Sequence, residues 1–79
     1  MDTTFSSAAR HRIRTKVRVE VRNLYRLRGS LKYIANLMDV TEGCVRAWID
    51  GKSLPSFTMA QRIAPLLGLD PMTGEEMKT

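Results

Sequence analysis

The sequence has few of the residues that cross-link or interrupt a chain: among 79 residues there are one cysteine, three prolines and five glycines. The single Cys44 excludes an intramolecular disulfide, so we expect packed elements in a reducing compartment to supply the stability. No apolar run approaches the roughly 18 residues that a membrane span requires. The first residues also lack the apolar stretch of a secretory signal. These absences predict a cytoplasmic protein.

The residues that enzymes and metal sites need are also scarce. His11 is the only histidine, and no Cys, Asp or Glu stands near it at the spacing of metal ligands. The glycines are isolated, which excludes a glycine-rich phosphate loop. Glu75 and Glu76 are neighbours in the sequence, which is not how a general acid and base are held apart. Because a chain this short leaves little room for a cleft beside its core, we expect one domain without enzyme activity, cofactor, metal or small-molecule substrate.

The net charge of +5 is unevenly distributed along the chain. Residues 1–28 carry eight basic and two acidic residues, a balance of +6, whereas residues 29–79 carry five basic and six acidic residues, a balance of −1. Seven of the eight basic residues in the first segment are arginines. Guanidinium groups recognise phosphate well, so this segment suits a polyanion. The alternative is a helix face that is simply solvated.

Two periodicities compete in residues 10–28, which follow a Thr- and Ser-rich segment, 1–9, that we interpret as a disordered arm. Apolar residues recur at helical spacing in this stretch, but they also alternate with charged residues as in a strand. A strand would need a partner from another subunit, so we prefer a helix from about residue 12 to residue 28, ended by Gly29. On such a helix an arginine series at i, i+4 spacing lies on a side distinct from the apolar stripe and is made of Arg14, Arg18, Arg22 and Arg26.

Residues 30–52 predict two short helices joined by a tight turn. The first would bury Ile34, Ala35 and Met38, and the second would begin after Thr41, whose hydroxyl can cap it. Gly51 follows the last apolar residue, where a left-handed conformation is expected. The inward side chains of the second helix would be Val45, Trp48 and Ile49. The spacing of apolar residues in this segment is also compatible with an ordinary pair of packed helices in any small all-α domain.

The remaining residues predict a fourth helix and a short fifth one. Ser56, or Thr58 with Gln61, can cap the fourth helix, in which Pro65 would produce a kink or a tightened final turn. Asp70 and Pro71 have the pattern of a cap and first position of a last helix. The last helix would carry Met72 and Met77. Gly68 would end the fourth helix, and Leu69 would pack back against the domain. The predicted buried face of the fourth helix consists of Phe57, Ala60, Ile63, Ala64 and Leu67.

Residues 30–70 resemble, without a gap, the helix-turn-helix domain of the lambda-repressor and Cro-like (Xre-type) regulators. Ser30, the Ile34–Ala35 pair and the Val40–Thr41 turn match that family's pattern, as do the buried Val45 and Trp48. The loop from Trp48 through Gly51 and Lys52 to Pro55 and Ser56 matches as well. Two positions depart from the pattern: Asp39 replaces the turn glycine, and Leu31 replaces a Gln that often contacts phosphate.

The resemblance implies an all-α fold of four to five helices, with a basic N-terminal helix and a helix-turn-helix domain over 10–79. It also implies a sequence-specific regulator that binds double-stranded DNA in the nucleoid. Such regulators are of the repressor or Cro type found in phages and mobile elements, and they are commonly autoregulatory dimers on two half-sites. Met72 and Met77, or Val19, are the candidate dimer surfaces. Two alternatives remain open: a protein-interaction module, antitoxin-like or polymerase-binding, and a DNA-bending accessory factor for recombination.

The second motif helix would then enter the major groove. Glu42 can accept a hydrogen bond from cytosine, Arg46 can donate two to guanine or contact a phosphate, and Cys44 or Ala47 can touch a thymine methyl. Few of these groups are long, so backbone approach or DNA shape would contribute to recognition. The candidate base contacts are Thr41, Glu42, Gly43, Cys44, Arg46 and Ala47. The candidate backbone contacts are Ser30, Lys32, Lys52 and Ser53, with Arg10, Arg12 and Arg14 along the backbone or in a minor groove.

Overall fold

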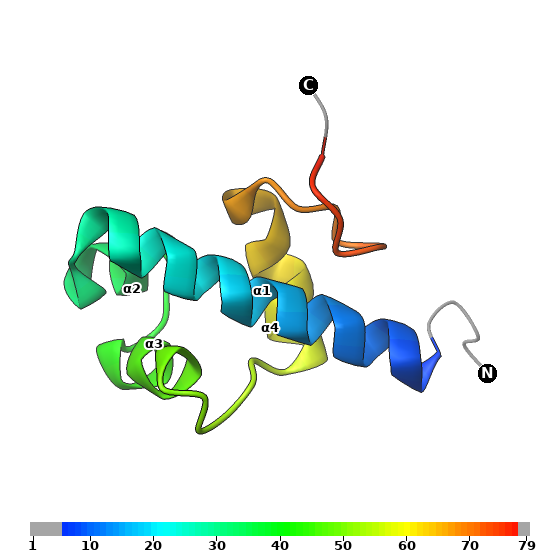
Figure 1. Cartoon of the computed structure of the whole chain (residues 1–79), viewed down its shortest axis with the longest axis horizontal. Coiled ribbons are helices and arrows are strands. Elements are labelled where there is room, and N and C mark those ends of the chain that lie inside the picture. Colours follow the sequence, from blue (N-terminus) through cyan, green and yellow to red (C-terminus); the bar gives the residue numbers. More distant parts are fainter. Residues whose placement is uncertain (1–5, 78–79) are drawn as a thin grey trace.

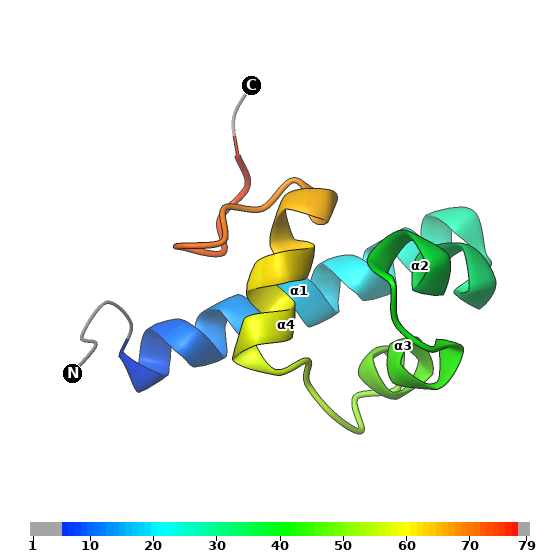
Figure 2. The same cartoon turned by 180° about the vertical axis from the view of Figure 1, so that it is seen from behind.

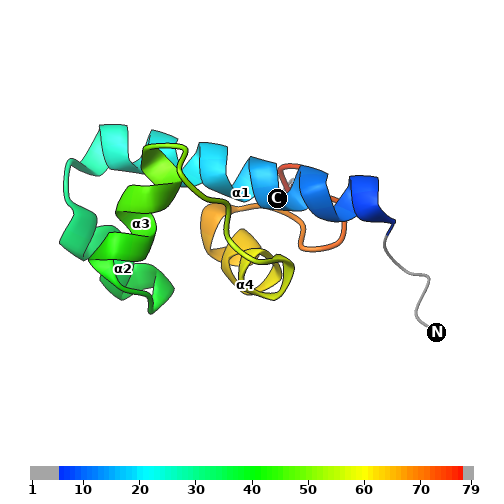
Figure 3. The ribbon, with the colours of Figure 1, turned by 90° about the horizontal axis from the view of Figure 1, so that it is seen from below.

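A computed structural model describes residues 6–77, and the regular secondary structure in these residues consists of helices, as predicted (Figure 1). The long first helix runs across the molecule, and the shorter helices pack along one side of it, which is clearest from below (Figure 3). The elements are α1 (Ser7–Arg28), α2 (Leu31–Met38), α3 (Glu42–Ile49), α4 (Phe57–Ile63) and the 3-10 helix η1 (Ala64–Leu67). None of the helices in residues 6–77 combines the length and apolarity needed to cross a membrane.

Helix α1 confirms the helical interpretation of the basic segment and excludes the strand. Its apolar stripe, Ile13, Val17 and Val21, is fully buried. The helix starts earlier than predicted because the Ser6 hydroxyl accepts a hydrogen bond from the Ala9 N–H at 3.1 Å and caps it. The predicted arm is therefore wrong for residues 7–9, and its residues 1–5 lie outside the described part of the chain.

The α2–α3 pair forms as predicted from residues 30–52. The hydroxyls of Ser30 and Thr41 cap the two helices by accepting hydrogen bonds from the N–H groups three residues further on, each at 3.1 Å. Asp39 adopts the left-handed conformation, with φ of 56°, at the point where the chain leaves α2. A single core joins these helices to α1 and α4 through Ile13, Val17, Val21, Ile34, Ala35, Met38, Val45, Trp48, Ala60, Ile63, Ala64 and Leu69.

Asp39 is the one residue other than glycine with positive φ among those described, and this gives a test of the turn. We expect Asp39→Gly to raise the free energy of unfolding by roughly 0.5 to 1 kcal/mol, because glycine takes this conformation without the steric cost of a side chain. Urea unfolding would measure the change. Asp39→Ala is the matched control and should be destabilising, and a glycine variant less stable than the alanine variant would contradict the assignment.

Pro65 shortens α4 as the sequence suggested. Ser56, rather than Thr58, caps the helix by accepting from the Met59 N–H at 3.2 Å. Because proline cannot donate the next helical hydrogen bond, the chain tightens into η1 after Ile63, which is the second of the two predicted outcomes. Gly68 then ends η1 with φ of 75°.

The predicted fifth helix is wrong, because residues 70–77 form a turn that folds back on the end of η1. The Asp70 carboxylate accepts from the Met72 N–H at 2.7 Å, and the Asp70 backbone pairs with Gly74 and Glu75. The Met77 N–H donates to the Gly68 carbonyl at 2.8 Å. These local bonds compete with helical ones, as short polar side chains commonly do after a helix. Leu69 packs back into the core, as predicted, and is 1% exposed.

Candidate nucleic-acid interface

Helix α3 lies at the surface, below α1 in Figure 1, whereas η1 lies above α1. Figure 2 shows α2 and α3 joined by a short link. Val45 and Trp48 hold α3 against the core, with exposures of 0% and 4%. The rest of its first two turns faces outward: Thr41, Glu42, Gly43, Cys44 and Arg46 are exposed, and Ala47 is half-buried. The residues proposed to touch bases therefore share one surface of one helix.

The first turn of α3 presents backbone and small side chains. The Thr41 Oγ1 accepts from the Cys44 N–H, which leaves the hydroxyl proton available to donate outward. Cys44 is an exposed free thiol. At Gly43 a Cβ atom would meet only Thr41 Oγ1, at 3.9 Å, so the outer side of this turn is open. A flat ligand surface can approach the α3 backbone closely here.

Arg46 makes an ion pair that was not anticipated from the sequence. Its Nε lies 3.4 Å from the Asp50 Oδ2, one turn further along α3, and the two side chains are 54% and 36% exposed. An exposed pair of this kind contributes only about 0.3 to 0.5 kcal/mol. A guanine or phosphate can therefore compete for the guanidinium, while the pair holds it over the outer face of α3 in the free protein.

The candidate backbone contacts are attached to the ends of the two motif helices. The Ser30 hydroxyl accepts from the Tyr33 N–H and retains its own proton for a phosphate. Lys32, in the first turn of α2, is exposed, and so are Lys52 and Ser53 after α3. The backbone N–H groups of Lys52 and Ser53 both donate to the Ala47 carbonyl, at 2.9 and 3.4 Å. This ties the start of the α3–α4 loop to α3.

Arg10, Arg12 and Arg14 lie within α1, so they are not part of an extended minor-groove arm. The Arg10 guanidinium lies 5.4 Å from the centre of the Phe57 ring, over α4. Arg14 donates from Nε to the Pro55 carbonyl at 2.7 Å, which links α1 to the α3–α4 loop. The α1 cap at Ser6 is the physical reason for this helical placement. Arg10 and Arg12 remain exposed and can meet phosphate from the helix surface.

The arginine series of α1 is less exposed than the side chains of a fully solvated helix face would be. Arg14, Arg18 and Arg22 are half-buried, and only Arg26 is exposed. One nitrogen of Arg18 and the Nε of Arg22 are buried without a hydrogen-bond partner. Half-burial of this kind is common for arginine, whose methylene stem can pack against the protein while the charged end reaches solvent. The helical spacing predicted the series but carried no information on its burial.

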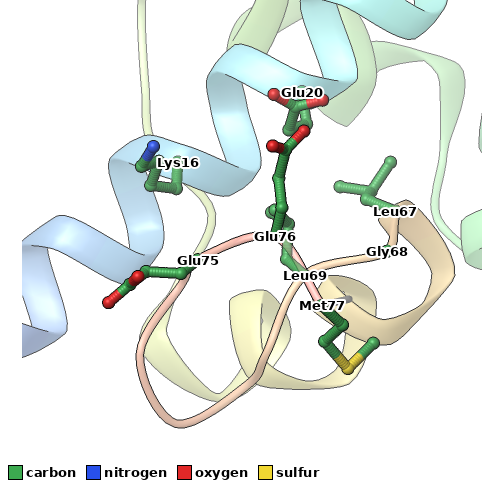
Figure 4. Close-up of a pocket in the computed structure, with 8 residues that line it drawn as sticks. All are labelled: Lys16, Glu20, Leu67, Gly68, Leu69, Glu75, Glu76 and Met77. Carbon is green, nitrogen blue, oxygen red and sulfur yellow. The ribbon is translucent and has the colours of Figure 1, made fainter. Parts of the chain in front are cut away.

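An open depression of about 810 Å³ lies between α1 and the C-terminal turn (Figure 4). Its charged lining is mainly acidic, with Glu20, Glu75 and Glu76 against Lys16. Within residues 6–77 no group of three or more His, Cys, Asp or Glu side chains could hold a metal ion. The depression therefore has the wrong sign of charge for a polyanion and belongs to a different surface from α3.

A second surface was missed by the sequence analysis. Leu27, Tyr33, Leu37 and Leu66 are exposed apolar residues that line a shared groove. They come from α1, α2 and η1, so no periodicity within one helix connects them. In the sequence, the one indication of this surface was that these apolar residues do not belong to the stripes that form the core. Only the packing of the three elements brings them together.

A scan against protein-family models found no match, and searches of curated proteins and of solved structures found no significant match. The interface therefore rests on the residues and their geometry.

Proposed function

We propose that this protein is a sequence-specific regulator that binds double-stranded DNA through a lambda-repressor-like helix-turn-helix, as a repressor or Cro-like factor of the phage or mobile-element type. The observation that carries the proposal is the outer face of α3. Val45 and Trp48 anchor the helix, and Asp39 adopts the left-handed conformation where the chain leaves α2. The exposed residues on the other side are Thr41, Glu42, Gly43, Cys44 and Arg46. Such a helix can enter a major groove with its first turns at the base edges.

Side-chain recognition would centre on Arg46 and Glu42, with Cys44 and Ala47 offering apolar contact to a thymine methyl. Gly43 and Thr41 would allow close backbone approach, so DNA shape would add to the specificity. Phosphates would be met by Ser30, Lys32, Lys52 and Ser53 on either side of the motif, and by Arg10 and Arg12 on α1. A cytoplasmic location at the nucleoid follows from this proposal.

Arg46→Ala is the most informative substitution on α3. If Arg46 pairs with guanine, we expect discrimination between specific and non-specific duplex to fall by about 1 to 3 kcal/mol. If it contacts a phosphate instead, binding would weaken equally on all sequences and the salt slope would shrink by about one unit. Fluorescence anisotropy on both duplexes separates these outcomes. Asp50→Asn is the matched control, since it removes the ion pair and keeps the guanidinium, so discrimination should persist.

The proposal itself is tested by titrating the protein against the DNA that flanks its own gene and against a scrambled duplex of equal length. Preferential binding to the flanking DNA would support an autoregulating DNA-binding protein. Equal and weak binding to both duplexes would contradict it, provided that circular dichroism shows the protein to be folded.

A protein-interaction module is the second candidate, and the charge of α3 favours it. Glu42 and Asp50 oppose the single Arg46, which is itself paired with Asp50. Such a module would bind duplex weakly and without sequence preference, so the same titration distinguishes the two functions.

A further inference from the structure

The groove described above is lined by four large apolar side chains that are exposed to solvent. It encloses about 390 Å³ between the C-terminal half of α1, α2 and η1. Leu27 is 83% exposed, Leu66 47%, Tyr33 42% and Leu37 40%. Contiguous apolar groups of this kind mark interaction surfaces more often than scattered ones do.

Charged groups at the groove indicate what would occupy it. Glu20 and Arg28 both line it and stand eight residues apart on α1, which is about 12 Å along a helix. The Arg28 guanidinium lies 5.1 Å from the centre of the Tyr33 ring, which holds it at the groove. At the Glu20 end, the adjoining depression adds Glu75 and Glu76 against one basic residue, Lys16 (Figure 4). One end of this surface is therefore acidic and the other is basic.

Such a surface is complementary to itself under a two-fold rotation. If two α1 helices cross antiparallel near residue 24, Glu20 of each copy faces Arg28 of the other. Leu27, Leu37 and Leu66 of both copies would then be buried between the two ion pairs. We propose that a second copy of this chain occupies the groove and forms an isologous dimer through the C-terminal halves of α1. This surface differs from both dimer surfaces suggested by the sequence.

Leu27→Glu tests the dimer directly, by sedimentation equilibrium from low micromolar to near-millimolar protein without DNA. The wild type should dimerise, and the variant should raise the dimer Kd by about 10-fold or more, since it places a charge at the centre of the interface. Leu27 is so exposed in the single chain that the substitution should leave the fold intact, which circular dichroism would verify. Met72→Glu is the matched control at an apolar residue outside the groove, 53% exposed, and should not change the Kd.

The antiparallel arrangement is tested by charge exchange. Glu20→Arg and Arg28→Glu should each weaken self-association, because each places two like charges together twice in the dimer. A mixture of the two variants should recover dimers, since each copy then offers the charge that the other lacks. Unfolded variants would not complement each other. A wild type that remains monomeric throughout, or charge variants that dimerise as the wild type does, would overturn the proposal.

The dimer and the DNA-binding function are tested separately, because sedimentation is carried out without DNA. A monomer that binds duplex would overturn the dimer only, and a dimer that binds no duplex would overturn the DNA-binding function only.

Discussion

Trp48→Ala is expected to lower the free energy of unfolding by about 3 to 5 kcal/mol. Trp48 is 4% exposed and belongs to the core that joins α1, α2, α3 and α4. A domain of this length has on the order of 4 to 12 kcal/mol in total, so the loss removes much of its stability. The helices α2 and α3 are too short to persist without this packing.

Urea unfolding followed by circular dichroism would measure the loss. Trp48→Phe should retain a cooperative transition, because it keeps most of the buried apolar surface. Val19→Ala is the control on α1, where the side chain is 37% exposed, and should change the free energy of unfolding by no more than about 0.5 kcal/mol. A Trp48→Ala protein that melts as the wild type does would mean that Trp48 does not stabilise the core.

The affinity for duplex DNA should fall roughly 100-fold between about 50 and 200 mM salt. The estimate assumes that four exposed cations, Arg10, Arg12, Lys32 and Lys52, each neutralise one phosphate and release its counterion. The slope of log affinity against log salt would then be about −3.6. Anisotropy titrations at several salt concentrations would give this slope. A flat dependence would exclude the phosphate contacts and with them the proposed DNA-binding mode.

Lys32→Ala and Lys52→Ala should each reduce the magnitude of that slope by about one unit. Arg62→Ala is the matched control, because it removes one positive charge from an exposed site on α4, outside the proposed interface. If Arg62→Ala weakened binding as much as either lysine variant, the attraction would be a diffuse effect of net charge rather than a defined surface.

Apart from the start of α1, the helix ends and the buried stripes were predictable because their causes lie within a few residues. Ser30 and Thr41 cap the helices that follow them, and Gly29 and Asp39 take the left-handed conformations that end α1 and α2. The last segment was predicted incorrectly for the same kind of local reason. An Asp followed by Pro is compatible with both a helix cap and a turn. Gly74, with φ of 77°, and the hydrogen bond from the Met77 N–H to the Gly68 carbonyl accompany the turn that forms here.

The candidate recognition surface on α3 also follows from local sequence, since burying Val45 and Trp48 obliges the intervening residues to face outward. Its ion pair between Arg46 and Asp50 lies at the i, i+4 spacing that helices favour, and an inspection of charge spacing would have suggested it. The half-burial of Arg18 and Arg22 had no such local signal, because it depends on which elements pack beside α1.

The sequence by itself determined where the four α-helices lie, most of their caps and the stripes that form the core, because hydrogen bonds and periodicity act within one or two turns. The tertiary structure alone decided the contacts between distant segments. Arg14 holds the Pro55 carbonyl 41 residues away, and Leu27 meets the groove that Leu66 lines from η1. Such neighbours are set by how whole helices pack around one core, and that packing decides which apolar residues remain exposed as a surface for a partner.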